Sequence, residues 1–301
     1  MNTLFTPFRS KHLNLKNHIA MAPMTRSRAI GNIPNEIMAA YYALRAEAGL
    51  IITECTAPSK NGLGYPNIPG IYSDEQVAGW KKVTDAVHAK GGKIYLQVMH
   101  TGRIGHPLNI PEGGEIVAPS AIAAAGVMFT MQEGPQPHPV PRAMTGEDIM
   151  QAQQEFVDAA KNAMQAGFDG IEIHAANGYL PNQFINPASN QRQDEYGGSI
   201  ENRCRFVLEV TEKVVDAIGA DRTAIRLSPF VEFNDLKLYD EAAETYQYLV
   251  SKLNVMDLAY LHLLDVKVMG ATGGSANFLE ELVSNYEGAV MFNGGMIGKL
   301  D

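Results

Sequence analysis

The chain has 301 residues, which is long enough for one (β/α)8 barrel of ~250 residues with some decoration. A formal net charge of −9 and the lack of a basic run disfavour a nucleic-acid partner, because phosphate binding needs clustered Lys and Arg. The two cysteines, Cys55 and Cys204, have no CxxC spacing, which argues against disulfides, an iron–sulfur cluster or another metal site. With no signal peptide and no apolar run of ~18 residues, we expect a cytoplasmic protein without a membrane partner.

Short apolar, β-branched runs alternate with longer helical patterns, which is typical of repeated βα units and a parallel sheet. In chain order, the predicted strands cover residues 18–21, 50–53, 94–98, 170–173, 223–227, 259–262 and 289–292. An all-parallel sheet of this kind normally closes, since an open one leaves two unpaired edges. We therefore predict an α/β fold, a TIM (β/α)8 barrel with the eighth βα unit missing from this chain, as a single domain over residues 1–301.

Three of the predicted helices have readable ends. Ser73 with Gln76, and Thr145 with Asp148, form capping-box patterns ahead of apolar residues at helical spacing. A third helix is predicted over about residues 199–219. The Pro- and Gly-rich stretch 105–141 is long for a βα loop, and such loops usually act as lids or carry small secondary structure of their own.

The most informative stretch follows the fourth predicted strand. That strand ends in His174, and Asn177 and Tyr179 come directly afterwards. The imidazole and the amide supply two hydrogen-bonding groups for a carbonyl or nitro oxygen, and the phenol is a potential proton donor. A lone histidine at a strand end is more often structural, but the pattern H-x-x-N-x-Y after a buried strand is far more specific.

Further unusual residues fall at or after the ends of other predicted strands, where barrel active sites are assembled. They are Pro23, Met24 and Thr25 after the first strand, Cys55 after the second, Gln97 and His100 at the third, Arg226 in the fifth, and Gly294 and Gly295 after the seventh. Taken singly, Thr25 and Gln97 have a bland interpretation as a turn cap and a satisfied strand amide. Convergence from separate elements favours a site.

Residues 174–198, together with Met-Ala-Pro-Met-Thr-Arg-Ser-Arg at 21–28, resemble the Old Yellow Enzyme family of FMN-dependent ene-reductases. The resemblance runs from Leu4 to Gly295 and stops before the family's last strand. It implies an FMN-binding domain, NAD(P)H as reductant, a small electron-poor alkene as substrate, and a monomer or homodimer. No G-x-G-x-x-G follows a strand, so we expect the nicotinamide to bind transiently over the flavin.

The resemblance also assigns cofactor contacts. Pro23 and Met24 through their backbone, and Thr25 through its hydroxyl, would contact the flavin ring near its C4 oxygen and N5. Gln97 would bind the pyrimidine edge, and Arg226 would stabilise negative charge on the N1/O2 side of the reduced ring.

Three further cofactor positions are implied at the backbone level. Cys55 stands where the family contributes backbone, so we expect no thiol chemistry from it. Gly294 and Gly295 would help to hold the FMN phosphate, in a barrel whose phosphate sites are built from loops after strands seven and eight. The family's later Gly-Arg phosphate clamp has no counterpart before Asp301.

For the substrate, the resemblance implies that His174 and Asn177 bind the activating oxygen and that Tyr179 protonates the α-carbon. Preorganised donors at that oxygen stabilise the transition state more than the ground state. Tyr65 matches a tyrosine of the substrate pocket. Met99 replaces a tryptophan found in many members, and since Met is smaller and more flexible, it predicts tolerance of bulkier substrates.

Other classes of protein remain as alternatives. Dienoyl-CoA reductases add an iron–sulfur domain, which two separated cysteines do not support. An isomerase or aldolase on the same barrel would need a catalytic Glu or Schiff-base Lys at a strand end, and neither is evident. The non-enzymatic alternative is a truncated barrel without stable FMN binding, acting as an inactive scaffold or partner-dependent subunit.

Overall fold

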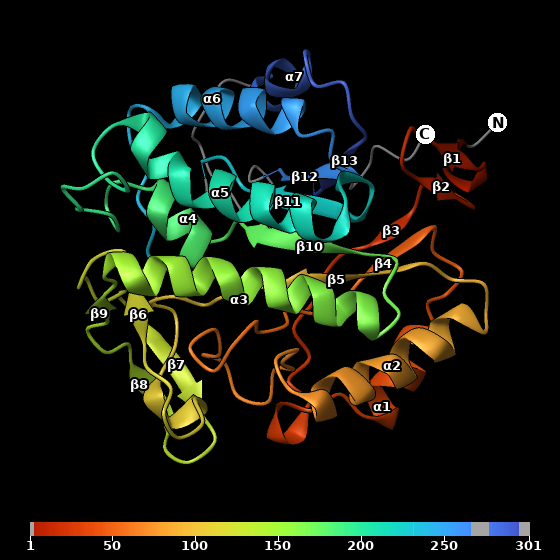
Figure 1. Cartoon of the computed structure of the whole chain (residues 1–301), viewed down its shortest axis with the longest axis horizontal. Coiled ribbons are helices and arrows are strands. Elements are labelled where there is room, and N and C mark those ends of the chain that lie inside the picture. The colour runs from red at the N-terminus through yellow and green to blue at the C-terminus, as the bar shows by residue number, and fades with distance from the viewer. Residues whose placement is uncertain (1–2, 231, 266–276, 295–301) are drawn as a thin grey trace.

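A computed structural model describes residues 3–230, 232–265 and 277–294. Seven strands of this part of the chain form the main sheet: β3 (Ala20–Met21), β4 (Leu50–Ile52), β5 (Ile94–Val98), β10 (Gly170–Ala175), β11 (Thr223–Leu227), β12 (Tyr260–Leu264) and β13 (Val290–Asn293). Their order is β13-β12-β11-β10-β5-β4-β3, and all neighbours are parallel. The curled sheet, with helices along its outer side (Figure 1), confirms the predicted α/β architecture.

The helices connect successive strands. They are α1 (Glu36–Ala43), α2 (Asp74–His88), α3 (Gly146–Gln165), α4 (Leu180–Ile185), α5 (Ile200–Ile218), α6 (Ala242–Val255) and α7 (Phe278–Val283). Both predicted capping boxes are present, at Ser73 ahead of α2 and at Thr145 ahead of α3. Gly219, with φ of 94°, ends α5 as predicted. No described helix combines the length and apolar character needed to cross a membrane.

The long stretch 105–141 has secondary structure of its own, as predicted. It contains the 3-10 turn η3 (Pro107–Asn109), the strand β6 (Val117–Ala118) and the hairpin β7 (Val127–Thr130) with β8 (Gly134–Pro137). Strand β6 pairs with β9 (Arg142–Ala143), which leads directly into α3. The remaining short elements are η1 (Thr3–Phe5), β1 (Phe8–Arg9), β2 (Asn14–Leu15), η2 (Ile30–Asn32) and η4 (Ala220–Arg222).

Alternation along the strands separates an apolar outer face from an inner face that is apolar at one end and polar toward the carboxyl ends of the strands. On β10, Ile171 and Ile173 belong to the large core cluster that also contains Trp80 of α2 and Phe156 of α3. Successive side chains of a strand point to opposite faces, so Glu172 lies on the inner side of the sheet. The outer face therefore anchors the helices, and the inner face is left for polar chemistry.

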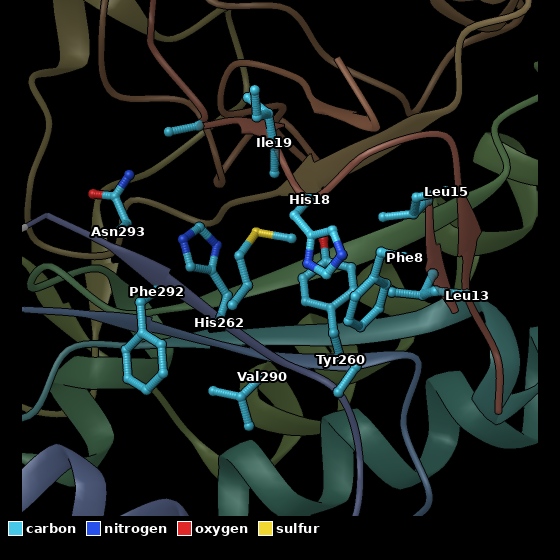
Figure 2. A pocket seen from close by; sticks show the side chains of 14 residues that line it. Phe8, Leu13, Leu15, His18, Ile19, Tyr260, His262, Val290, Phe292 and Asn293 are labelled. Atoms are coloured by element: carbon cyan, nitrogen blue, oxygen red, sulfur yellow. The ribbon is translucent and has the colours of Figure 1, made fainter. Parts of the chain in front are cut away.

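The two edge strands of the sheet are β3 and β13. A cavity of about 260 Å³ lies between them, lined by β1, β2 and β3 on one side and by β12 and β13 on the other (Figure 2). Its walls include Leu15, His18 and Val290. The described residues place no strand in this gap. That the eighth βα unit is missing from the chain stays a prediction, because residues 295–301 lie outside the described part.

Candidate active site

Polar side chains from four neighbouring strands form two rows across the inner face. Gln97 of β5 is the register partner of Glu172 of β10. One step further along β10, His174 is the partner of Arg226 on β11, which in turn is the partner of His262 on β12. All five side chains are buried, with exposed fractions of 6% or less. The sheet register therefore brings together residues that are up to 165 positions apart, between 97 and 262.

The buried carboxyl group of Glu172 is the centre of the first row. Gln97 Nε2 donates a hydrogen bond to its Oε1 at 2.6 Å, and His262 Nδ1 lies 2.8 Å from its Oε2. Burial by itself would raise the pKa of Glu172, but His262 and Arg226 outweigh it and hold the pKa below its ordinary value. Glu172 is therefore a carboxylate, which accepts hydrogen bonds and donates none.

The loop after β10 is held in an unusual backbone conformation. Asn177 has φ of 57° and Gly178 has φ of 81°, in the left-handed region that favours Gly and Asn. Asn177 donates its N–H to Ser228 Oγ at 2.8 Å, and Asn234 Nδ2 donates to the Asn177 carbonyl at 2.8 Å. A Cβ atom on Gly178 would lie 2.7 Å from Cβ of Asn234. Contacts with Ser228 and Asn234 thus fix the backbone on which the Asn177 and Tyr179 side chains are placed.

Tyr179 is the N-cap residue of helix α4 and forms a pair with Tyr65. Their hydroxyl oxygens are 3.2 Å apart, and the Asn234 amide interacts with both phenols. The Tyr179 ring also packs edge-on against the His174 ring, with 4.9 Å between the ring centroids. Burial, and then the neighbouring Tyr65, raise the pKa of Tyr179 well above its ordinary value. The phenol therefore keeps its proton throughout the neutral range.

His174 is neutral for a related reason. Burial, followed by the charge of Arg226, lowers the pKa of His174 well below its ordinary value. Within the described part of the chain, three buried polar atoms at this site have no hydrogen-bond partner: His174 Nδ1, Asn177 Oδ1 and Arg226 Nε. Buried polar groups are nearly always paired, because an unpaired one costs free energy. Their position beside one another fits a polar ligand, and Arg226 in particular fits the electron-rich side of a flavin.

Cys55 and Met99 border this group. Both are buried and belong to one apolar cluster with Tyr179, against which Tyr65 packs. The Cys55 thiol donates to Gln97 Oε1 at 3.1 Å and interacts with the Thr25 hydroxyl. Burial raises the pKa of Cys55 to about 12, so the sulfur stays a protonated thiol.

The remaining predicted cofactor residues lie on the two sides of this centre. Pro23 is half-buried and Met24 is exposed, both in the loop after β3. Gly294 follows β13 with φ of 96°, a value that suits Gly. Gly295 lies outside the described residues. Gly294 directly follows β13, the strand that pairs with the strand carrying His262.

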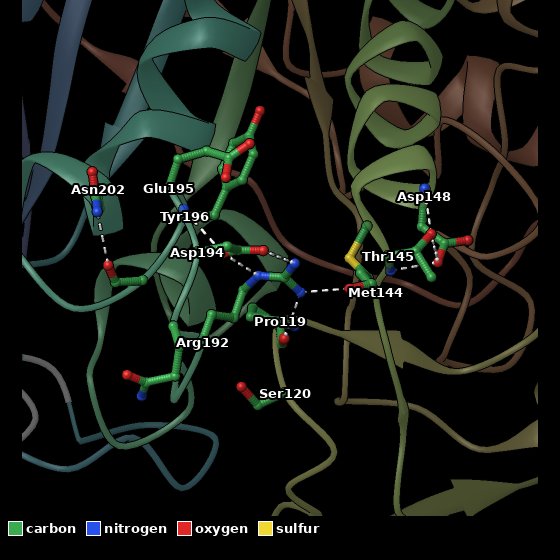
Figure 3. Close-up of polar contacts among 12 residues, drawn as sticks. Pro119, Ser120, Met144, Thr145, Asp148, Arg192, Asp194, Glu195, Tyr196 and Asn202 are labelled. Carbon is green, nitrogen blue, oxygen red and sulfur yellow. Dashed lines mark hydrogen bonds and ion pairs between the residues drawn. The ribbon is translucent and has the colours of Figure 1, made fainter.

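An arginine fixes the loop that follows α4. Arg192 donates to the carbonyls of Pro119 and Met144 and forms an ion pair with Asp194 (Figure 3). Nearby, Gln191 donates its N–H to Ser120 Oγ at 2.9 Å. These bonds tie the 186–198 stretch to the 105–141 insertion and to the start of α3. Arg192 therefore has a structural role, because it holds the 186–198 stretch against the rest of the fold.

Sequence reasoning missed three residues of the site. Glu172 and His262 each stand inside an apolar strand, and a period of two from His174 could have placed Glu172 on the same face. Nothing in the local sequence marks Asn234, whose partner Asn177 is 57 positions away.

The curled parallel sheet and its buried polar inner-face layer are those expected of an FMN-dependent oxidoreductase, and the comparisons show this class. Residues 3–289 match the NADH:flavin oxidoreductase / NADH oxidase family, and the chain belongs to it as an enzyme of the Old Yellow Enzyme type. The chain is 46% identical over 285 residues to a "probable flavin mononucleotide-dependent alkene reductase" of Leishmania infantum, covering 93% of this chain and 77% of that protein.

Solved structures give the same result. Morphinone reductase superposes with a TM-score of 0.93 at 42% identity, covering 98% of this chain and 80% of that one. The Old Yellow Enzyme homologue from Zymomonas mobilis gives a TM-score of 0.91 at 41% identity, with coverages of 97% and 82%. The enzyme is FMN-dependent and uses a reduced nicotinamide as the family does, which confirms the predicted class and cofactor.

Proposed function

We propose that this enzyme reduces the carbon–carbon double bond of electron-poor alkenes, namely α,β-unsaturated carbonyls, maleimides and nitro compounds, with NAD(P)H as reductant. The observation that carries the proposal is the placement of a buried His174 imidazole, whose Nδ1 has no partner among the described residues, next to a protonated phenol on Tyr179, with the Asn177 carboxamide between them in the chain. A relative at 46% identity is itself described as a probable alkene reductase, which supports the same chemistry.

In this proposal, five residues hold the flavin ring: Pro23, Met24, Thr25, Gln97 and Arg226. These residues would hold FMN, which would supply the hydride-transfer chemistry between NAD(P)H and the alkene through its N5. The Arg226 guanidinium, whose Nε is buried and unpaired, suits the negative charge of the reduced ring. Backbone groups of Cys55 and of Gly294 and Gly295 complete the cofactor site, the two glycines on the phosphate side.

His174 and Asn177 bind the oxygen that activates the alkene. Charge develops on this oxygen as the β-carbon is reduced, so donors already in place stabilise the transition state more than the ground state. Because His174 is neutral, its imidazole can donate without carrying a charge that the buried site would disfavour. Tyr179 then gives its proton to the α-carbon.

Tyr65 and Met99 shape the substrate pocket in this proposal. Met99 is fully buried beside Tyr179, so a larger side chain there would have to displace a neighbour. We expect Met99→Trp to lower kcat/KM for bulky enones more than for small ones. Steady-state kinetics on a matched pair of enones test this, and unchanged selectivity would contradict the role of Met99.

An eighth strand would close the barrel in the gap between β3 and β13. Among the described residues, the gap separates two strand edges that have no further neighbour and is hollow over about 260 Å³, which leaves room for one more strand. Titrating a protein of residues 1–301 with FMN, followed by flavin absorbance, measures whether this length of chain retains the cofactor. Weak binding that recovers when a C-terminal strand is added would support this placement.

Tyr179→Phe tests the catalytic proposal directly. We expect reduction of the bound flavin by NAD(P)H to be nearly unchanged, and reoxidation by an enone to slow ~10²–10⁴-fold, since the variant lacks the general acid. Anaerobic stopped-flow absorbance separates the two half-reactions. Tyr248→Phe on α6, half-buried on the outer side, is the matched control. Equal reoxidation rates in Tyr179→Phe and the wild type would contradict the assignment of the proton donor.

A further inference from the structure

Glu172 is the buried carboxylate at the centre of the first row on the inner face, and the reaction proposed above assigns it no role. Its exposed fraction is 0%, and it stands in the middle of β10 with a strand on each side. Burying a charge is costly unless it is paired, and Glu172 is paired with Gln97 and His262 at once. Because both of its carboxylate oxygens are paired, Glu172 determines how its hydrogen-bonding partners are oriented.

The effect on Gln97 follows from the chemistry of the two groups. A carboxylate only accepts hydrogen bonds, so the Gln97 amide must turn its NH2 toward Glu172, at 2.6 Å. The amide oxygen then points to the other side, where the Cys55 thiol donates to it at 3.1 Å. An amide beside neutral partners could adopt either orientation. Here the charge of Glu172 leaves only one.

This orientation decides what Gln97 offers to a ligand. One N–H is used by Glu172, so the second N–H and a lone pair of Oε1 remain, as an adjacent donor and acceptor. The pyrimidine edge of an isoalloxazine presents a carbonyl oxygen next to an imide N–H, which is the complementary pattern. A flipped amide would meet the same edge with its donor and acceptor exchanged.

We propose that Glu172 is a positioning residue for cofactor binding, which fixes the polarity of the Gln97 amide so that it matches the pyrimidine edge of FMN. His262 completes this hydrogen-bond arrangement, because its Nδ1–H donates to the other oxygen of the Glu172 carboxylate at 2.8 Å. The inference rests on the Gln97 contact of the proposed function and is independent of the alkene chemistry.

A double-mutant cycle on FMN affinity tests the inference. Glu172→Gln is nearly isosteric but neutral, so it permits the Gln97 amide to flip, and we expect it to weaken FMN binding about 10- to 100-fold, as for loss of a charge-assisted hydrogen bond. In a Gln97→Ala background the same change should cost less than about 3-fold, because the amide on which Glu172 acts is gone. Quenching of flavin fluorescence on titrating the apoprotein measures each Kd.

Two controls separate this role from simple packing. Cys204→Ala truncates a fully buried side chain in α5, outside the inner-face site, so FMN affinity should stay within about 3-fold of the wild type. Urea unfolding of each apoprotein reports any general loss of stability. Equal losses of affinity from Glu172→Gln in both backgrounds would overturn the inference, since the residue would then act without Gln97.

Gln97→Glu keeps the inference testable if Glu172→Gln does not fold. Two carboxylic acids would then face each other, and one must hold a proton to replace the lost N–H donor. FMN affinity of this variant should therefore rise as pH falls from 8 to 5, relative to the wild-type profile. A profile parallel to the wild type would overturn the inference. If the double-mutant cycle gives the expected FMN affinities but the wild-type enzyme does not reduce alkenes, only the proposed substrate class is contradicted.

Discussion

The centre of the sheet and its two edges differ in how deeply their residues are buried and in how many neighbouring strands they have. All six residues of β10 are buried, and the strand has a parallel neighbour on each side. At the edges, β3 has two residues, both half-buried, and β13 has one exposed and three half-buried residues. The cavity of about 260 Å³ lies between these edges. The proposed proton donor and oxygen-binding groups thus follow the best-supported strand, while part of the proposed cofactor site follows the weakest ones.

This difference suggests that the central strands hold the catalytic groups in position, whereas the edge strands limit the local stability of the fold. Residues that must be held precisely gain from two strand neighbours and a helix layer. Edge strands with few buried contacts open at lower free energy than the rest of a protein. We therefore expect substitutions at the centre of the sheet to lower stability more than matched substitutions at its edges.

Matched isoleucine truncations measure the difference in support. Ile173→Ala on β10 removes a side chain with 0% exposure and should lower the free energy of unfolding by about 2–5 kcal/mol. Ile19, which is 38% exposed beside the cavity, should cost only about 1 kcal/mol on the same change, because little apolar surface is lost. Urea unfolding of the two variants makes the test. Equal losses would mean that the edge is as well packed as the centre.

Two glycines with the same backbone angle isolate the contact that positions the catalytic loop. Gly178 and Gly198 both have φ of 81°, but a Cβ on Gly178 would lie 2.7 Å from Asn234, whereas one on Gly198 would meet nothing within 4 Å. Each Ala variant should lose about 1 kcal/mol from backbone strain. Gly178→Ala should lose ~1–3 kcal/mol more through overpacking.

Kinetics give the second readout of this pair. Gly178→Ala should also lower kcat/KM for an enone, since Asn177 and Tyr179 flank the shifted residue, while Gly198→Ala should not. The two unfolding curves and a steady-state assay are sufficient. If both variants keep wild-type kinetics, the contact with Asn234 does not position the loop.

The sequence predicted the strands and helix starts because these depend on local patterns. Apolar β-branched runs marked the seven strands, and Ser73 and Thr145 marked helix starts through side chains only three residues from their partners. The cluster after β10 was also predicted, since His174, Asn177 and Tyr179 are nearly consecutive. Whether they carry the roles proposed for them is a matter for the kinetic tests.

Contacts across the sheet could not be predicted in the same way. Gln97 and Glu172 are 75 positions apart and meet only because β5 and β10 pair in one register. The Tyr65–Tyr179 pair spans 114 positions. Register and loop packing depend on the whole fold, so the charge environment that fixes the Gln97 amide is visible only in three dimensions.

The central region should also be a source of acid sensitivity. Burial lowers the pKa of His100, whose exposed fraction is 1%, to about 3. The unfolded state therefore binds a proton below its ordinary pKa of ~6.5 while the folded state does not, so stability is full above that pH and falls as the pH decreases. His100 alone should cost about 1.5 kcal/mol between pH 6.5 and 5.

His100→Gln should flatten this part of the stability profile by that amount, whatever its effect at pH 7. Urea midpoints at half-unit pH steps measure the slope. His174, whose pKa is also lowered by burial, should keep a residual slope of the same sign in the variant. A variant profile as steep as the wild type would show that His100 takes up a proton in the folded state.

The reaction rates of the two cysteine thiols measure local opening at the edge and at the centre of the sheet, and here we expect only a small difference. Cys55 follows β4, the neighbour of the edge strand β3, and Cys204 lies in α5 over the centre of the sheet. Burial raises the pKa of each to about 12, so neither should react with Ellman's reagent in the native state unless the structure opens locally. In Cys204→Ala and Cys55→Ala, which leave one thiol each, the rate at low urea reports that opening. We expect Cys55 to react several-fold faster, since the edge opens first. Faster reaction of Cys204 would place the weakest part of the fold in the helix layer and not between β3 and β13.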